Sequence, residues 1–311
     1  MSAMAIVLQE GLRAVFYAPF YAALALGAYD AEGIAARLVS SPSPGQTPDG
    51  LFAGTVDVSW GGPMRVNEIY DRRPDCDLVC FGEAVTRDPF MLIGRTPCPD
   101  FRPAMLERVR LGTVSEVPTP WLCLQEDLRR AGIDPEKIDR VSDRSMAENA
   151  ASLRRGEIDV VQLFQPFAEE LLAAGAGHLW YAAADRGPCS YTTFYARRAA
   201  LEAKRDEMRR LVRGLYRTQR WLAGATPERV AEVVAPYFPA VPQPLLTAAL
   251  ARYRELGIWN RTPVLPRDGY ERLKAGLVSS GFAKGVPFET AVDNSLAEEA
   301  VAADPPPLSP G

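Results

Sequence analysis

Histidine and lysine chemistry has few candidate residues in this chain. His178 is the only histidine, although most base-activated serine or cysteine nucleophiles and most histidine-ligated metal sites need a well-placed imidazole. The stretch Gly175–Leu179 around it is expected to be a loop at the end of a helix, where a surface or helix-capping role is favoured over a catalytic one. Schiff-base chemistry is similarly limited, because the chain has few lysines: Lys137, Lys204, Lys274 and Lys284.

The cysteines favour structural thiols over a metal site or a disulfide framework. They are odd in number and scattered along a chain that is long enough to have a large core: Cys76, Cys80, Cys98, Cys123 and Cys189. Cys76 and Cys80 have the spacing of metal ligands, but no second pair follows, so buried thiols are favoured over zinc. Cys189 has only Arg186 as a nearby basic residue, and we interpret it as structural as well.

Sequence motifs of common enzymes are absent. The chain has no phosphate-binding loop, no glycine-rich dinucleotide fingerprint after a strand, no H-E-x-x-H and no G-x-S-x-G. We therefore expect no catalytic residue, no metal and no cofactor.

Aromatic residues gather at the expected ends of strands. In open α/β sheets the loops at the carboxyl ends of the strands form the ligand crevice, and aromatic faces with a few polar groups suit a flat or partly apolar small molecule. Each residue alone is better explained as a cap on the core, but the set favours a pocket lined by Phe16, Tyr17, Trp60, Trp121, Phe164 and Tyr191. The polar groups expected beside them are Ser59, Glu83, Thr113, Ser115 and Gln165.

A glycine turn is expected to add backbone donors to this pocket. The strand Val56–Trp60 runs into Gly61-Gly62-Pro63, and a helix is expected over Met64–Tyr70. Such a turn leaves backbone N–H groups free at the start of a helix, where they can hold an anion or a carbonyl oxygen. We expect Gly61 and Gly62 to orient the ligand together with Gln165. The side chains expected to stack on the ligand are Tyr17, Trp60 or Trp121.

The elements that position these residues alternate between strands and helices, which is the pattern of a parallel α/β sheet. The first expected strands are Ala5–Leu8, Ile34–Val39 and Val56–Trp60. The alternation restarts near Phe101 and predicts a second compact α/β unit of about 100 residues. Beyond Ala199 the chain is expected to be helical, and the proline-rich tail 304–311 is expected to be disordered.

Composition excludes several classes of partner. The chain has 311 residues, 47% of them apolar and 24% charged, which predicts a large core and about two domains. A net charge of −4 gives no general attraction to nucleic acid or anionic lipid. The most apolar stretch, Ala14–Tyr29, is short and contains Pro19 and Gly27, so no membrane insertion is expected. No secretory leader is recognisable, which predicts a cytoplasmic protein as the chain stands, or a periplasmic one if a leader is missing from it.

Several segments resemble one family of binding proteins. The opening carries PFYAA at Pro19–Ala23 and GAYDAEGI at Gly27–Ile34, and the segments Leu51–Pro63, Leu153–Leu171 and Val292–Val301 follow in a matching order. Over nearly its whole length the chain resembles the periplasmic-binding-protein family. That family includes nitrate, taurine and alkanesulfonate binders and the thiamine-pyrimidine precursor binders and synthases.

The resemblance implies a type II periplasmic-binding fold, with two α/β lobes, two crossovers, a ligand cleft between the lobes and extra C-terminal helices. Lobe one would comprise residues 1–86 and 190–303, and lobe two residues 87–189. The cleft would be formed by loops that carry the aromatic residues named above, at 16–17, 59–62, 113–119 and 164–166. In the taurine and sulfonate binders an arginine or lysine helps to hold an anion. Here the candidates for that role are Arg13, Arg87 and Arg144.

The resemblance also implies the function. We expect a solute-binding protein of the ABC-transporter type, which closes two lobes over a small heteroaromatic or organic-anion ligand and has an ABC permease as its partner. Enzymes of the same fold are the alternative, acting on a pyrimidine or an aromatic acid through His178 or Glu83. The pyrimidine synthases need a lysine and a histidine near the N-terminal cleft, and the sulfinate desulfinases need a cysteine in the first loop, Gly11–Pro19, which has none. A third possibility is a regulatory domain that binds a protein.

Overall fold

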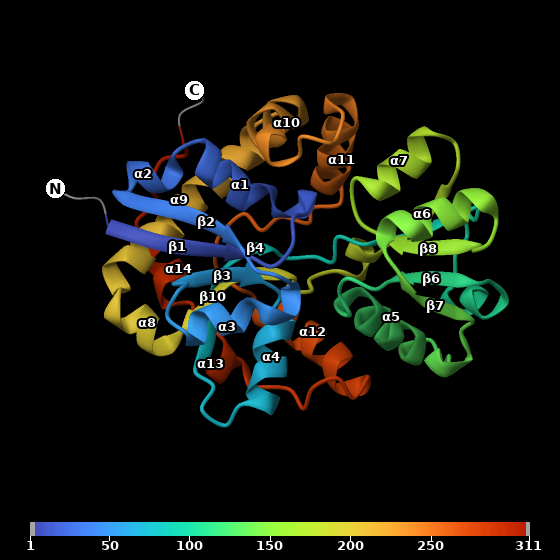
Figure 1. Cartoon of the computed structure of the whole chain (residues 1–311), viewed down its shortest axis with the longest axis horizontal. Coiled ribbons are helices and arrows are strands. Elements are labelled where there is room, and N and C mark those ends of the chain that lie inside the picture. Colours follow the sequence, from blue (N-terminus) through green and yellow to red (C-terminus); the bar gives the residue numbers. More distant parts are fainter. Residues whose placement is uncertain (1–3, 309–311) are drawn as a thin grey trace.

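Two five-stranded sheets organise the chain. The structure is a computed structural model that describes residues 4–308, and within them the strand orders are β2-β1-β3-β10-β4 and β7-β6-β8-β5-β9. Figure 1 shows the two sheets at opposite ends of an elongated molecule, joined by two narrow segments. We call the part that contains the first sheet lobe one and the part that contains the second sheet lobe two. The predicted α/β fold with two lobes is confirmed.

The first sheet is parallel on one side and antiparallel on the other. Its strands are β1 (Met4–Glu10), β2 (Ile34–Ser40), β3 (Val58–Gly61), β4 (Leu78–Val85) and β10 (Thr192–Arg197). Strand β1 pairs in parallel with β2 and β3, whereas β10 lies between β3 and β4 and runs antiparallel to both. Phe194 is opposite Trp60 in this register.

The second sheet repeats this arrangement. Its strands are β5 (Met91–Gly94), β6 (Leu111–Val114), β7 (Arg140–Arg144), β8 (Val160–Leu163) and β9 (His178–Ala182). Strand β6 is parallel to β7 and β8, and β5 is antiparallel to β8 and β9. The alternation of strands and helices has the pattern of a parallel sheet, and the structure adds one antiparallel strand inside each sheet, β10 and β5. The chain enters β5 and β10 from the side of the cleft, where the parallel strands end, so these two strands must run in the opposite direction.

Helices cover both sheets (Figure 1). Lobe two carries α5 (Thr119–Arg130), α6 (Met146–Arg155) and α7 (Phe167–Ala173). Lobe one carries the remaining helices: α1 (Ala18–Ala25), α2 (Ala28–Ala31), α3 (Thr47–Phe52), α4 (Pro63–Arg72), α8 (Arg198–Ala203), α9 (Arg205–Gly224), α10 (Pro227–Val234), α11 (Gln243–Glu255), α12 (Arg267–Ser279), α13 (Phe288–Ala291) and α14 (Ser295–Ala302).

Helix α9 shows how the sequence pattern produces the packing. Its apolar residues recur at helical spacing, and Met208, Leu211 and Leu215 are fully buried against α1, α2 and α14. The chain beyond Ala199 is helical as expected, and Lys204 separates α8 from α9. This packing holds α1, whose Phe20 ring stacks on Trp60 at a centroid distance of 4.8 Å. The core of lobe one thereby fixes a residue at the edge of the cleft.

Two crossovers connect the lobes. Residues 86–90 lead from β4 to β5, and residues 183–191 lead from β9 back to β10. The crossovers are hydrogen-bonded to each other, because the Cys189 amide donates to the Thr86 carbonyl at 2.8 Å and the Ala183 amide to the Phe90 carbonyl at 2.9 Å. The predicted lobe limits, 86/87 and 189/190, fall inside these two segments.

A buried ion-pair network ties the crossovers to lobe two. Arg186 on the second crossover donates to Asp88 on the first at 2.7 Å and to Asp127 on α5 at 2.5 Å. The side chains of Arg186 and Asp88 are 4% and 0% exposed. Removing charges from water to this extent is costly unless each charge is paired, so the three residues depend on one another.

The C-terminal segment, for which disorder is expected from the sequence, contacts α9 in the part that the structure describes. Leu308 is buried, and Arg217 and Arg220 on α9 donate to the backbone carbonyls of Pro306 and Pro305. The prolines prevent regular structure there, but the carbonyl groups that they leave free are bound by arginine side chains. Residues 309–311 of the predicted tail lie outside the described residues.

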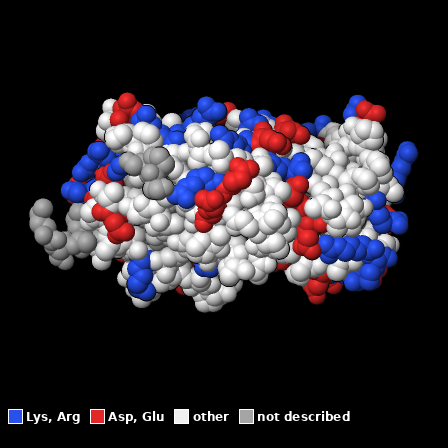
Figure 2. Space-filling view, turned by 90° about the horizontal axis from the view of Figure 1, so that it is seen from above, with Lys and Arg blue, Asp and Glu red and all other residues white. Residues whose placement is uncertain are grey.

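The surface offers no extended field of one sign on the face seen in Figure 2. Acidic and basic side chains lie mostly next to one another there, with uncharged surface between them. Within residues 4–308, no helix combines the length and the apolar character that crossing a bilayer requires.

Candidate functional site

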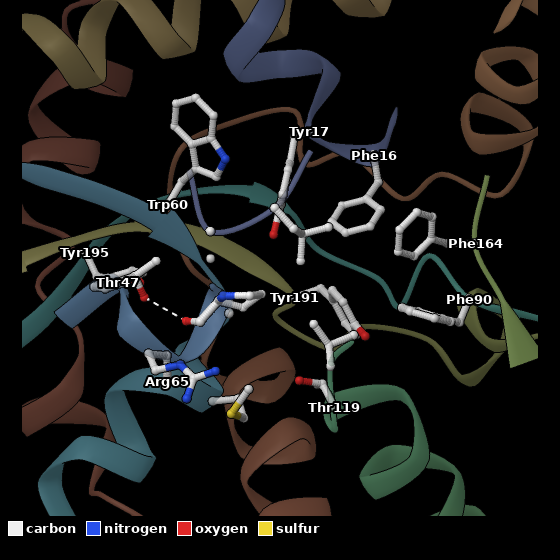
Figure 3. A pocket seen from close by; sticks show the side chains of 17 residues that line it. Phe16, Tyr17, Thr47, Trp60, Arg65, Phe90, Thr119, Phe164, Tyr191 and Tyr195 are labelled. Atoms are coloured by element: carbon white, nitrogen blue, oxygen red, sulfur yellow. Dashed lines mark hydrogen bonds between the residues drawn. The ribbon is translucent and has the colours of Figure 1, made fainter. Parts of the chain in front are cut away.

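A cavity lies between the two lobes at the ends of β3, β6 and β8 (Figure 3). Its empty volume is about 560 Å³, which includes the open mouth. Lobe one contributes the 11–17 loop, the start of α4 and the beginning of β10, and lobe two contributes Val117, Thr119 and Phe164. A ligand in this space would contact both lobes.

One side of the cavity is aromatic. Phe16 from lobe one meets Phe164 from lobe two edge to face, with 5.2 Å between the ring centroids, and Phe90 on the first crossover meets Phe164 in the same way at 5.2 Å. The ring centroids of Tyr17 and Trp60 lie 6.2 Å apart. These rings make this side of the cavity an aromatic wall, which suits a ligand that carries a ring.

The opposite side is polar and is built around the glycine turn. Gly62 is the N-cap of α4 and Pro63 is its first residue. A side chain at Gly62 would be crowded, since a Cβ atom there would be 3.1 Å from the Tyr191 carbonyl oxygen and the backbone would have to shift slightly. Nearby, the Tyr195 hydroxyl donates to the Thr47 hydroxyl at 2.6 Å. The two glycines thus let the ends of β3 and β10 approach each other beside the cavity.

Arg65 provides the charge of the site. It is the third residue of α4, it lines the cavity, and it is 8% exposed. Its guanidinium donates to Glu68, whose carboxylate also accepts from Arg72 at 2.6 Å. Figure 3 shows Arg65 and Thr119 reaching toward the same space from the two lobes.

Two helices begin at this space. Helix α4 starts beside Arg65 and helix α5 starts at Thr119, and neither has a side-chain cap. Pro63 and Pro120 have no N–H group, and the Arg65 amide donates to the Gly62 carbonyl at 2.9 Å. The two helix starts therefore act mainly through the helix dipole, which makes this end of a helix favourable for negative charge. Together with Arg65, the two helix starts make one end of the cavity suited to an anion.

The tyrosines of the cavity contribute no negative charge. Burial raises the pKa of Tyr17 and Tyr191, and it raises the pKa of Tyr195 to about 12. Arg65 is therefore the ionised side chain among the lining residues, and the cavity has a cationic end and an aromatic end.

Comparisons with known proteins agree with this architecture. Residues 100–236 match the model of the NMT1-like family. The Bacillus subtilis (strain 168) protein named "Putative binding protein YtlA" is 22% identical over 293 residues, covering 93% of this chain and 88% of YtlA.

Two solved structures have the same fold. The ligand-binding component of an ABC-type import system from Staphylococcus aureus gives a TM-score of 0.74 at 15% identity, covering 96% of this chain and 99% of that one. The periplasmic aliphatic sulphonate binding protein SsuA from Escherichia coli gives a TM-score of 0.72 at 16% identity. The match covers 90% of this chain and 93% of SsuA. This chain has the periplasmic substrate-binding fold. The fold that the resemblance implies is confirmed.

Seven of the residues expected from the sequence line the cavity of this binding fold: Phe16, Tyr17, Trp60, Gly61, Gly62, Phe164 and Tyr191. Arg65, Phe90 and Tyr195 line it too but were not singled out. The signal for Arg65 was its position in the first turn of the helix after Gly61-Gly62, which is where a side chain can turn back toward the helix start.

Six expected residues do not line the cavity: Ser59, Glu83, Thr113, Ser115, Trp121 and Gln165. Neighbouring residues of a strand point to opposite faces, so when Trp60 faces the cleft, Ser59 faces away, and its hydroxyl donates to Gln9 at 2.7 Å. Thr113 is buried beside Arg140, and Ser115 is exposed. Trp121 lies under the Arg140 guanidinium, 4.6 Å from ring centroid to Cζ.

Glu83 lies fully buried in β4, away from the cavity. It accepts from Asn260 at 2.5 Å, and its backbone amide donates to the Pro263 carbonyl. Burial raises the pKa of Glu83 to about 8, so the carboxyl group is protonated at neutral pH. Its contacts are with the loop after α11, which assigns it a place in the core of lobe one.

The raised pKa of Glu83 predicts a pH dependence of stability. In the unfolded chain the Glu83 carboxyl ionises near its ordinary pKa, and in the folded protein it ionises only near pH 8. The protonated Glu83 therefore contributes fully to the free energy of unfolding at acid pH, and this contribution is lost as the pH rises to about 8. The free energy of unfolding should fall by up to about 1.4 kcal/mol per pH unit in this range. Glu83→Gln should remove this contribution, which urea unfolding at pH 5 to 9 measures. Equal slopes for the two proteins would contradict it.

The other residues considered from the sequence lie elsewhere. Arg13 pairs with Glu10 at 2.5 Å, Arg87 donates to the Ala184 carbonyl in the crossovers, and Arg144 pairs with Glu157 at 3.1 Å. His178 is exposed at the start of β9 and lies on a shallow surface hollow of lobe two. Cys189 is buried next to Cys123. Among residues 4–308, no group of three or more His, Cys, Asp or Glu side chains could hold a metal ion.

A second contact between the lobes lies just beyond Phe164. Arg252 on α11 of lobe one donates two hydrogen bonds to Glu169 on α7 of lobe two, at 2.5 and 2.9 Å. The backbone amide of Gln165 donates to the hydroxyl of Tyr253 on α11 at 2.8 Å. Helix α11 therefore holds the loop that carries Phe164 against lobe one.

Breaking this contact should weaken ligand binding without unfolding the protein. Arg252→Gln removes hydrogen bonds that hold the lobes closed, so we expect ligand dissociation to become about ten-fold faster. Arg254→Gln is the matched control, because Arg254 also lies on α11 but donates to Ala223 and Ala225 within lobe one. Stopped-flow dissociation rates measure the effect. The same rate for both variants would show that the Arg252 contact does not hold the closed state.

Proposed function

We propose that this chain is the solute-binding protein of an ABC-type importer and closes two lobes over a small organic anion that carries a planar ring. The observation that carries the proposal is the position of Arg65, beside the uncapped starts of α4 and α5 and opposite an aromatic wall. A cationic end and an aromatic end in one cavity match a ligand with an anionic group at one end and a ring at the other.

The comparisons support the binding role. YtlA carries the name "Putative binding protein", and the Staphylococcus aureus structure is described as a ligand-binding component of an ABC-type import system. The Escherichia coli structure is described as a periplasmic aliphatic sulphonate binding protein. By analogy, the partners of this chain are a small ligand and a permease, and its place of action is outside the cytoplasmic membrane.

Unpartnered polar atoms in the cleft walls support a polar ring. The indole nitrogen of Trp60 and the hydroxyl of Tyr191 are buried and have no hydrogen-bond partner among residues 4–308. Burying a donor without a partner costs about 1–3 kcal/mol, and a ligand with acceptor atoms can recover this energy. A heteroaromatic ring supplies such atoms, whereas a purely hydrocarbon ring does not.

The enzymatic alternative gains no support from the geometry. It depended on His178 or on Glu83, and neither residue lines the cavity. We therefore interpret closure of the lobes as the functional step, with hinge motion at the two crossovers.

Calorimetry with simple probes tests the proposal. Benzoate and pyridine-3-carboxylate carry a ring and one negative charge, benzamide carries the ring without the charge, and acetate carries the charge without the ring. We expect at least one of the two ring-bearing anions to bind about ten-fold or more tightly than benzamide and acetate. Binding of benzamide as tight as that of both anions, or no binding of either anion, would overturn the proposed ligand class.

A further inference from the structure

Glu68 is the ion-pair partner of Arg65, the arginine that lines the cavity. It is 6% exposed, and its carboxylate accepts from Arg65 on the same helix, α4. It also accepts from Arg72, one turn further along, at 2.6 Å, but the Arg72 side chain is 66% exposed. The partner of Glu68 that faces the cavity is thus a buried cation, and the other is screened by water.

The charges near the cavity nearly balance before a ligand enters. Arg65 supplies one positive charge, and Glu68 supplies one negative charge in contact with it. The starts of α4 and α5 add only partial positive charges, about half a charge each. One anionic group of a ligand can be matched by the helix starts and by the free N–H groups of Arg65, but a second cannot.

We propose that Glu68 limits the ligand to a single negative charge. This inference rests on the proposed function, because it concerns the anion end of the same cavity. Glu68 does not line the cavity, but its buried carboxylate contacts Arg65, which does. It repels a second ligand charge through a medium of low effective dielectric, where such repulsion is much stronger than in water. Glu68 also holds Arg65 in place, so it acts as a positioning and selectivity residue.

The ratio of two affinities separates these roles. Benzoate has one charge and isophthalate has two on the same ring. A change in the position of Arg65 therefore affects both probes to a similar extent, whereas a change in local charge affects isophthalate more than benzoate. We expect Glu68→Gln to raise the affinity for isophthalate relative to benzoate about ten-fold. Glu68→Asp, which restores the charge, should return the ratio toward that of the parent.

Two further variants serve as controls. Asp75→Asn makes the same change in net charge at an exposed position, where Asp75 pairs with Arg73, and should leave the ratio unchanged. Arg72→Gln leaves Glu68 with Arg65 alone, so it should lower the affinity for isophthalate relative to benzoate about two-fold. This variant keeps the test valid if Glu68→Gln does not fold.

The outcomes are distinct. A parent protein that binds neither benzoate nor the pyridine carboxylate overturns the proposed function and this inference with it. A parent that binds benzoate, together with an unchanged ratio in Glu68→Gln or an unchanged ratio in Arg72→Gln, overturns the inference alone.

Discussion

Replacing Arg65 by glutamine is expected to weaken the binding of benzoate by a factor of about 10 to 100. A hydrogen bond to a charged group contributes about 1.5–3 kcal/mol, and Arg65 is the ionised side chain that lines the cavity. The fold should tolerate the change, because Glu68 keeps its pair with Arg72 at 2.6 Å. Isothermal titration calorimetry on Arg65→Gln and the parent measures the loss.

The neutral probe and a neighbouring arginine make this result specific. Benzamide has no charge for Arg65 to bind, so its affinity should change by less than about two-fold. Arg73 caps the same helix at its far end and pairs with Asp75 on the surface, so Arg73→Gln should bind benzoate as the parent does. If Arg65→Gln kept the parent affinity for benzoate, the anion end would have to be placed elsewhere in the cleft.

Replacing Arg186 by methionine is expected to lower the free energy of unfolding by about 3–5 kcal/mol, because it leaves a buried charge without its partner. Asp88 is fully buried, and Arg186 is its ion-pair partner, at 2.7 Å. Burial already raises the pKa of Asp88 while Arg186 lowers it, so the variant should regain stability as the pH falls and Asp88 becomes protonated. Urea unfolding at pH 7 and pH 5 measures both effects.

An exposed pair provides the comparison for Arg186. Arg95 and Asp159 also form an ion pair, at 3.4 Å, but their side chains are 51% and 42% exposed. Arg95→Met should lower the free energy of unfolding by less than about 1 kcal/mol. The double variant Arg186→Met with Asp88→Asn should recover part of the loss, since the unpaired charge is removed. A loss in Arg186→Met no larger than in Arg95→Met would show that the crossovers do not depend on this network.

Much of the fold could be predicted because the chain alternates regularly between strand and helix patterns. The strands near Ala5–Leu8 and Ile34–Val39 and the helix after Pro63 were found within a few residues of their limits. The direction of β5 and β10 could not be read in this way, because a buried strand has the same pattern in either direction. That direction depends on where the chain crosses between the lobes.

The candidate site was only partly readable from the sequence. Phe16, Trp60 and Tyr191 follow from their places at strand ends, where aromatic side chains have no regular position in a helix or sheet core. Arg65 was missed because it is one of many arginines and its pattern on α4 is that of an ordinary solvated helix face. A shift of one residue was enough to misplace Ser59, since alternate strand residues point to opposite faces.

The order of strands in the first sheet has a consequence for synthesis on the ribosome. Strand β10 occupies an inner position between β3 and β4, yet it emerges after all of lobe two, which is one continuous segment of chain. Domains generally fold as units while the chain is still growing, and contacts between distant residues form late. Lobe two can therefore fold as soon as β9 has emerged, while the sheet of lobe one waits, with the edges of β3 and β4 open, for residues 192–197. During that interval the nascent chain would be most in need of a chaperone.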